Sequence, residues 1–183
     1  MLDWREFGEG LRGHRDYFLQ FHTSYGTPAI TSVCQVGQDE LLVGDEFGNL
    51  NRVKGKSITH LASFGDGIFQ ILTYPDLDAC LVAVGFNKLV FMSLVCGNCR
   101  VMAFSRNLRR MALQGQTLWV GFADSEIQAF DLIVTFRSFK EEPVNRILRA
   151  HNRLSKAGTS SCSALVFDPF EQHIVYSVGL PDK

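Results

Sequence analysis

The sequence predicts an all-β fold of repeated four-stranded antiparallel sheets, and three observations support this prediction. The stretch 117–131 (TLWVGFADSEIQAFD) has the pattern of a β-hairpin, because two strand-like runs flank a short turn. Runs ending in Val-Gly recur with their glycines at positions 44, 85, 121 and 179, which are 41, 36 and 58 residues apart. The first two intervals lie near the period of about 40 to 45 residues that is typical of propeller blades. Fifteen phenylalanines and sixteen glycines against five prolines also suit short strands joined by tight turns.

Four repeat units follow one another along the chain. We predict them at residues 30–66, 67–107, 108–139 and 160–183. In the first two units, apolar runs separated by Gly, Asn, Asp or Pro predict strands at 30–36, 40–45, 50–53, 57–62, 68–74, 80–86, 89–95 and 99–104. Residues 1–29 lack this rhythm, and we expect an irregular N-terminal segment that could complete a neighbouring blade.

The third and fourth units are less regular. In the third, strands are expected at 108–113, at the two arms of the hairpin and at 133–139. A polar insertion at 140–159 follows, with a short helix expected over 143–150 because Pro143 suits a first helical turn. The fourth unit offers only two strands, at 162–167 and 174–179. We therefore expect other residues to finish its sheet.

One stretch, residues 79–96, is apolar enough to be tested as a membrane span. Asn87 and Lys88 lie near its middle. A central lysine costs roughly 2.5 to 3.5 kcal/mol in a spanning helix, whereas the same pair makes a good turn between two strands. The sequence therefore favours a hairpin here.

These repeats resemble, in a degenerate form, the WD40 family of β-propellers. Asp124 stands where the family has a structural aspartate in the turn after its second strand, and Phe130-Asp131 stands where its Trp-Asp pair ends the third strand. His151, in Ala150-His151, resembles the histidine of the Gly-His pair, and Asp182 stands at the turn position of the last unit. The first two units lack both dipeptides, although Asp45 or Gly48 could serve the turn of the first.

The resemblance implies a WD40-like propeller of about three and a half four-stranded antiparallel blades over residues 30–183. Propellers typically close with about 4 to 8 blades, so either the chain is a fragment or another polypeptide completes the ring. The family generally consists of non-catalytic platforms. The resemblance thus implies an interaction scaffold within a multisubunit complex.

Charge adds a local candidate for partner binding. The whole chain has a net charge of −1, which supplies no global field for nucleic acid or an anionic membrane. Between residues 137 and 156, however, there are six lysines and arginines and only two acidic residues. The candidate partner-binding residues are these six and two aromatic residues of turns: Arg137, Lys140, Arg146, Arg149, Arg153, Lys156, Phe47 and Phe122.

Two alternatives to a protein scaffold remain open. The basic insertion could bind phosphate groups in an RNA-associated propeller of a ribonucleoprotein. Alternatively, Arg109-Arg110 resembles in part the aromatic-Arg-Arg-Gly motif of phosphoinositide-binding propellers, although Leu108 and Met111 replace the aromatic residue and the glycine.

The sequence predicts no enzyme, no cofactor and no metal site. Cys96 and Cys99 have the C-x-x-C spacing of half a zinc site or a redox pair, but no second paired spacing supplies two further ligands. We therefore expect them to flank a tight turn as small side chains. Five cysteines and an N-terminus without an apolar signal sequence lead us to expect a reducing, intracellular and cytoplasmic location.

Overall fold

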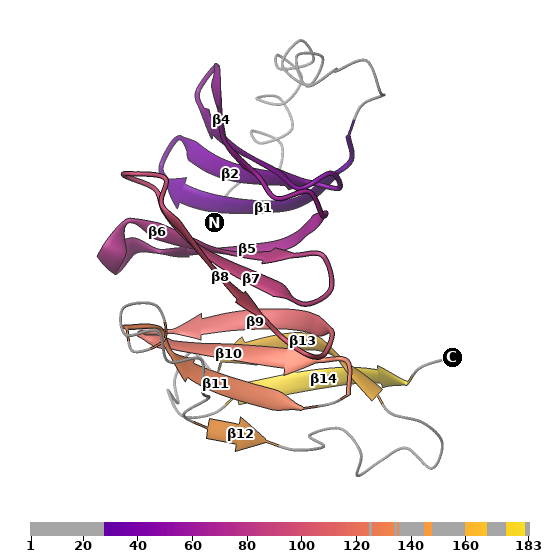
Figure 1. Cartoon of the computed structure of the whole chain (residues 1–183). Helices are drawn as coiled ribbons and strands as arrows, with labels where there is room; N and C mark the ends of the chain where they lie inside the picture. Colours follow the sequence, from indigo (N-terminus) through magenta and orange to yellow (C-terminus); the bar gives the residue numbers. More distant parts are fainter. Residues whose placement is uncertain are drawn as a thin grey trace, which may run out of the picture.

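The computed structural model describes residues 28–124, 126–133, 135, 145–147, 160–167 and 175–181. Within these residues the fold is all-β, with three four-stranded sheets and one two-stranded sheet, all antiparallel. Figure 1 shows the first three sheets following one another along a stack, as the colours pass from indigo to orange. The prediction of an all-β chain of antiparallel sheets is confirmed.

The first sheet is a simple meander. It contains β1 (Ile30–Gly37), β2 (Glu40–Asp45), β3 (Asn49–Lys54) and β4 (Ser57–Ser63), paired in that order. Leu42 of β2 and Leu50 of β3 are fully buried, and they pack toward the next sheet in the stack. The second sheet thus covers the buried side chains of the first.

The second sheet lies between two neighbours. It contains β5 (Ile68–Tyr74), β6 (Ala79–Val84), β7 (Lys88–Ser93) and β8 (Cys99–Ala103), and a short 3₁₀ turn (η2, Pro75–Leu77) joins β5 to β6. Every residue of β6 is buried, since one face of the sheet meets the first sheet and the other face meets the third. This explains why β6 has a continuous apolar sequence instead of an alternating one.

The stretch considered as a membrane span is therefore β6, a turn and β7. No helix in the described part of the chain is long and apolar enough to cross a membrane. Lys88 begins β7 at the end of the turn, where its ammonium group reaches Asp66. The preference for a hairpin is correct.

The third sheet contains β9 (Leu108–Gln114), β10 (Thr117–Phe122), β11 (Ile127–Asp131) and β12 (Asn145–Ile147). The hairpin predicted at 117–131 is present, with Thr117 opposite Asp131. The fourth strand differs from the prediction.

The strand predicted at 133–139 and the helix predicted over 143–150 are both wrong where the structure describes them. Leu132 and Ile133 are helical, and residues 145–147 form β12 inside the stretch taken as the insertion. The physical reason is the burial of Leu132, which is 1% exposed and turns into the core directly after β11. The apolar residues directly after β11 are thus buried in the core, and the strand conformation of β11 does not continue into them.

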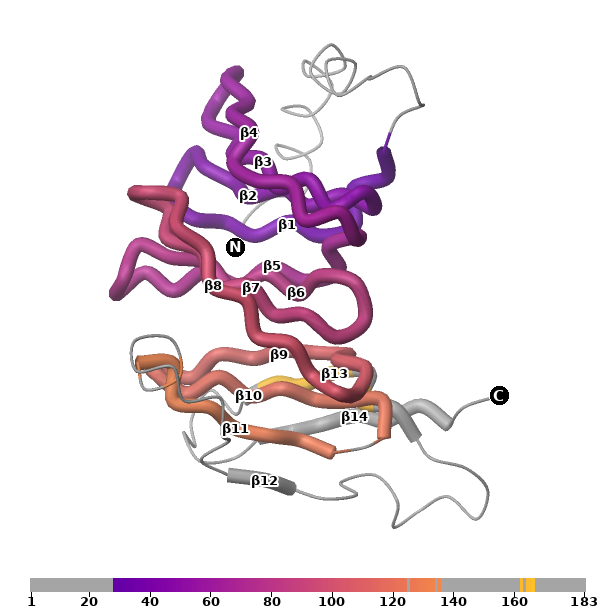
Figure 2. The backbone as a smooth tube through the Cα atoms, viewed as in Figure 1, coloured from indigo at the N-terminus to yellow at the C-terminus, as the bar shows by residue number. Residues whose placement is uncertain are grey.

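The last described sheet pairs β13 (Ser160–Phe167) with β14 (Val175–Pro181). β13 lies against β9, and β9 in turn neighbours β5, which lies beside β1. The strands β1, β5, β9 and β13 are called inner strands below. In Figure 2 the inner strands β1, β5 and β9 follow one another down the stack.

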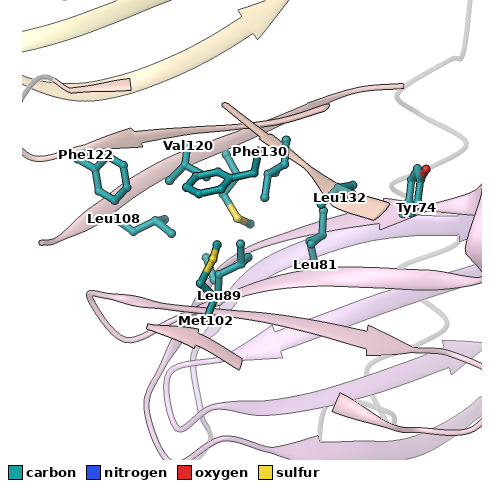
Figure 3. Packing of buried hydrophobic residues seen from close by; sticks show 12 residues of the cluster. Tyr74, Leu81, Leu89, Met102, Leu108, Val120, Phe122, Phe130 and Leu132 are labelled. Atoms are coloured by element: carbon teal, nitrogen blue, oxygen red, sulfur yellow. The ribbon is translucent and has the colours of Figure 1, made fainter. Parts of the chain in front are cut away.

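Apolar side chains between successive sheets form the core. The largest cluster lies between the second and third sheets, where Leu89 and Met102 meet Leu108 and Phe130 (Figure 3). A second cluster fills the space between the first and second sheets, and a third includes Cys162 of β13. Burial of this kind contributes roughly 25 cal/mol per Å² of apolar surface, so these interfaces hold the stack together.

Two glycines of the Val-Gly repeat, Gly44 and Gly121, lie where successive sheets come close, whereas a methyl group on Gly85 would lie nearest to Cβ of Asp66, at 3.2 Å, in the connection into its own sheet. A methyl group on Gly44 would lie 2.6 Å from Cγ2 of Ile68 in β5, and one on Gly121 would collide with Sγ of Cys162 in β13. The small residue thus admits the inner strand of the next sheet. At Gly44 and Gly121, the repeat seen in the sequence therefore coincides with packing between sheets.

Candidate functional site

A groove of about 740 Å³ crosses one end of the stack. It is lined by the starts of β1, β5 and β9, by the β2–β3 and β6–β7 turns, and by the connections that lead into β5 and β9. We call this side of the molecule the groove end. The opposite end carries the β1–β2, β3–β4, β5–β6 and β7–β8 turns.

The inner strands β1, β5 and β9 each have an extra residue where they reach the groove. Ile30 faces Asp45 and Ser32 faces Gly44, so Thr31 has no opposite residue in β2. The same irregularity leaves Phe69 unmatched in β5 and Arg109 unmatched in β9. Such bulges bend a strand and re-aim the side chain of the extra residue. All three residues line the groove.

The three bulge residues differ in chemistry. The Thr31 hydroxyl donates to the carbonyl of Gly44 at 3.2 Å and also contacts the carbonyl of Ile68, so it joins the first sheet to the second. The Phe69 ring is half-buried against the largest core cluster. Arg109 is exposed. Among the described residues, Arg109 is thus the charged bulge residue.

Charged side chains of opposite sign lie at the two sides of the groove. Glu46 and Asp66 belong to the part built by the first sheet and its connection to β5, whereas Arg109 and Arg110 begin β9. Asp66 is paired with Lys88 at 2.6 Å, and the Glu46 carboxylate accepts a bond from the Ala29 amide at 2.9 Å. The two sides of the groove therefore carry charged groups of opposite sign.

Backbone hydrogen bonds fix the turns that frame the groove. Glu46 N donates to Ala29 O at 3.1 Å, and Gly85 N donates to Gly67 O at 2.8 Å. The equivalent bond of the third sheet runs from Ala123 N to Asn107 O at 2.9 Å. Each bond ties a turn to the connection that precedes the inner strand of the same sheet. The frame therefore forms together with the sheets.

The β2–β3 turn is organised by a buried carboxylate. Asp45 is 4% exposed, and its Oδ1 accepts bonds from the amides of Phe47 at 2.9 Å and Asn49 at 2.8 Å. Asn49 extends this network to Ser63 at 2.8 Å. Asp45 thus occupies the turn that the WD40 resemblance assigned to Asp45 or Gly48, and it shapes the turn that carries Phe47.

The β10–β11 turn has a related arrangement. Asp124, the predicted turn aspartate, accepts a bond from the Glu126 amide at 3.3 Å. The Arg106 guanidinium contacts Asp124 at 3.0 Å and also the buried Glu126 carboxylate, and it lies 5.4 Å above the Phe122 ring. Arg106 therefore joins the connection before β9 to this turn.

The structure separates the two aromatic residues that the sequence singled out. Phe47 is 52% exposed beside the groove end, whereas Phe122 is fully buried and its ring packs edge-on against Phe104 at 5.1 Å. The expectation that Phe122 displays its side chain to a partner is wrong. The reason is that Phe122 points into the core cluster between the second and third sheets.

Phe86 was missed as a surface residue and is 70% exposed in the β6–β7 turn. The signal that would have found it is positional. An aromatic residue follows each of the first three Val-Gly pairs within three positions, at 47, 86 and 122. Residue 86 was assigned to the end of a strand, but β6 ends at Val84.

The basic segment contributes little to the described structure. Arg137, Lys140, Arg149, Arg153 and Lys156 lie outside the described residues, as do His151 and Asp182. Arg146, in β12, is described only through its backbone, which pairs with that of Gln128 in β11. Their proposed contacts stay predictions.

The C-x-x-C pair lies at the opposite end of the molecule. Cys96 and Cys99 are both exposed and unbonded to each other, at the β7–β8 turn. A hydrogen bond with the Ser93 side chain lowers the pKa of Cys96, whereas partial burial raises the pKa of Cys99. Among the described residues, no group of three or more His, Cys, Asp and Glu side chains is arranged to hold a metal ion.

This chain is similar to known proteins in fold but not in sequence. No family model and no curated protein sequence matches this chain. Of 612 solved chains that match, the computationally designed Ika8 protein has a TM-score of 0.62 at 13% identity, and covers 85% of this chain and 44% of its own. The designed Ika4 protein has a TM-score of 0.62 at 12% identity, with coverages of 86% and 89%.

A chain from the Mitotic Checkpoint Complex has a TM-score of 0.68 at 12% identity, covering 86% of this chain and 46% of that one. This chain thus spans less than half the length of the Ika8 and checkpoint chains. At identities of 12% and 13%, the likeness concerns the fold alone.

Proposed function

We propose that this chain is a non-catalytic protein interaction scaffold, a WD40-like β-propeller part that acts as a subunit of a larger complex. The single observation that carries the proposal is the groove end, where the turns of successive sheets meet around a groove of about 740 Å³. Exposed Phe47 and Phe86 stand on these turns. Exposed aromatic residues are frequent anchors of protein interfaces.

Three observations support the propeller part of the proposal. Strands in each of the three four-stranded sheets pair in chain order or its reverse, as in a meander. The inner strands lie side by side. The backbone also resembles a chain of the Mitotic Checkpoint Complex at a TM-score of 0.68. The described fourth sheet has two strands, and we infer that a further chain or segment completes the ring.

The chemistry of the groove favours binding over catalysis. The described residues of its lining include no histidine or cysteine, and the hydroxyl group among them, on Thr31, is engaged with backbone carbonyls. The carboxylate of Asp66 is paired with Lys88. General acid–base or nucleophilic catalysis needs a base beside a reacting group, and this lining offers positioning groups instead.

Neither alternative gains support from the groove. The RNA hypothesis depends on basic residues between 137 and 156, whose side chains the structure does not describe. Glu46 and Asp66 in the groove would repel a phosphate backbone. They would equally oppose a phosphoinositide headgroup at Arg109 and Arg110.

We propose an intracellular, cytoplasmic location because Cys96 and Cys99 are free and exposed.

Quantitative affinity purification of the tagged chain from its own cells tests the proposal. Phe86→Glu places a charge at the groove end, and Val95→Glu places the same charge at the opposite end, where Val95 is 78% exposed. We expect specific partner proteins of the wild type to be depleted at least about tenfold by Phe86→Glu and retained by Val95→Glu. Equal retention by both variants would contradict the proposal.

A further inference from the structure

The groove carries information about the kind of segment it can bind. Arg109 is the bulged residue of β9, exposed at the side of the groove built by the third sheet. Among the described residues, its guanidinium has no carboxylate or hydrogen-bonding partner. Arginine presents a planar fork of donors that suits a carboxylate in a bidentate arrangement. An acidic side chain is therefore the complement of this position.

The other side of the groove has the opposite preference. The Glu46 carboxylate accepts a single bond, from the Ala29 amide, at Oε1. Asp66 is paired with Lys88, but both side chains are exposed, at 51% and 42%. A basic side chain or another donor placed over Glu46 would be stabilised there. The two sides thus demand ligand charges of opposite sign.

Apolar surface lies between these charged sides. The second sheet contributes Phe69 and Phe86 to the groove, and the backbone of Gly67 and Gly85 lies beside them. An aliphatic side chain fits such a surface, since it removes apolar area from water. A groove of 740 Å³ lies within the range of about 300 to 1,000 Å³ typical of ligand sites.

We propose, resting on the scaffold function above, that the groove binds an extended peptide segment whose charges are ordered. Its acidic side chain lies against Arg109, its aliphatic side chain against Phe69 and Phe86, and its basic side chain toward Glu46. A polyanion such as RNA meets two carboxylates in this groove, whereas a segment of mixed charge is complementary along its whole length. The partner is therefore a protein with an acidic–aliphatic–basic segment.

A peptide-array selection with the purified full chain tests this inference. The probe is an octapeptide library, acetylated and amidated at its ends, with randomised internal positions. We expect the wild type to select peptides with Asp or Glu, then an aliphatic residue, then Lys or Arg, in either chain direction. Arg109→Glu removes the acidic preference and weakens the selected peptides at least about tenfold, and Arg109→Gln weakens them less.

The matched control is Lys56→Glu, which makes the same charge reversal in the β3–β4 turn at the opposite end. It is expected to leave binding unchanged. Arg109 and Lys56 are both exposed, so unchanged thermal unfolding of each variant shows that the fold is intact.

Four outcomes would overturn the inference. They are selection of no peptide, an acidic preference that persists in Arg109→Glu, tighter Arg109-dependent binding to single-stranded RNA, or tighter Arg109-dependent binding to vesicles containing phosphoinositides. If the groove binds peptides without regard to Arg109 and Phe86→Glu still removes cellular partners, this inference fails while the scaffold function stands. If Phe86→Glu removes no partner, the scaffold function itself fails.

Discussion

At the groove end and along the inner strands beside it, hydrogen bonds join one sheet to the next, whereas at the opposite end each described backbone bond stays within one sheet. Leu108 N donates to Phe86 O at 2.6 Å, and the Ile71 amide donates to Ser32 Oγ at 3.0 Å. The opposite end instead has Gly55 N bonded to Asp39 O and Leu94 N bonded to Asp78 O.

Steric packing around Gly48 differs in the same way from that around the turn glycines of the opposite end, although Gly65, in the connection into β5, also lies in open space. A methyl group on Gly48 would collide with the carbonyl of Asp66, which leads into the next sheet. At Gly55, Gly97 and Gly115, no atom lies within 4 Å of such a methyl group. The difference teaches that the groove end is a shared, pre-formed surface, while the opposite end consists of separate turns. Pre-formed surfaces lose less entropy on binding.

The largest expected effect comes from Gly48→Ala. Gly48 has a φ of +87° and lies against backbone atoms, so the substitution combines a left-handed conformation with a collision that only a backbone shift relieves. We expect a loss of about 3 kcal/mol or more in the free energy of unfolding, measured by urea denaturation. Gly55→Ala, at a φ of +54° in open space, should lose only about 1 to 2 kcal/mol. Equal losses would mean that contact between sheets does not matter at Gly48.

The next effect concerns Arg106. Its partner Glu126 has a side chain that is only 6% exposed, so Arg106→Met removes a cation that contacts a buried carboxylate. We expect a loss of about 2 to 4 kcal/mol in thermal or urea unfolding. Lys88→Met is the control, because Lys88 and Asp66 are both exposed, and it should cost less than about 1 kcal/mol. Combining Arg106→Met with Glu126→Gln should recover part of the loss, and no recovery would contradict the assignment.

A smaller effect is expected at Gln70. Its side-chain amide donates to the C=O of Met111 and accepts from the N–H of Met111, both at 2.8 Å. Gln70 of β5 thus pairs the backbone groups of Met111 in β9. Gln70→Leu keeps the side chain but removes both bonds, and we expect a loss of about 1 to 3 kcal/mol. Gln35→Leu removes an exposed bond to Gly37 within β1 and should change stability by about 0.5 kcal/mol or less. A similar loss in both variants would argue against the link between sheets.

The smallest effect is chemical. The lowered pKa of Cys96 means that more of its thiol is ionised below pH 9 than that of Cys99, whose pKa is raised. Burial raises the pKa of Cys80 to about 12 and that of Cys162 to about 11. At pH 7.5, iodoacetamide labelling followed by mass spectrometry should modify Cys96 first, then Cys99, with Cys80 and Cys162 protected until unfolding. Faster labelling of Cys99 than of Cys96 would contradict this order.

Much of the fold could be predicted because strand signals are local. The alternation and turn residues of the first two units placed β2 and β5 at their observed bounds, and the Val-Gly pairs at Gly44 and Gly121 marked the close approach of successive sheets. The strand at 133–139 failed because burial of Leu132 in a distant cluster decided the local conformation. Periodicity cannot reveal a contact between sheets.

The candidate site was harder to predict than the fold. The groove depends on register, since a bulge at Arg109 becomes visible only when β9 is aligned with β10. Phe122 shows the same limit, because its position directly after Val-Gly matches that of exposed Phe86, yet the neighbouring sheet covers it. Residue types therefore indicate which turns lie at an end of the sheets, but the packing of neighbouring sheets decides which side chains of those turns are exposed.

The most direct test of the central claim, that partners dock at the groove end, is site-specific photo-cross-linking. A photoreactive phenylalanine analogue replaces Phe86 in one variant and Val95 in another, so that equally exposed positions at the two ends are compared in the same cells. We predict a discrete cross-linked partner from position 86, which disappears when Arg109→Glu is added, and none from position 95. A partner captured from position 95 alone, or from both positions equally, would contradict the account.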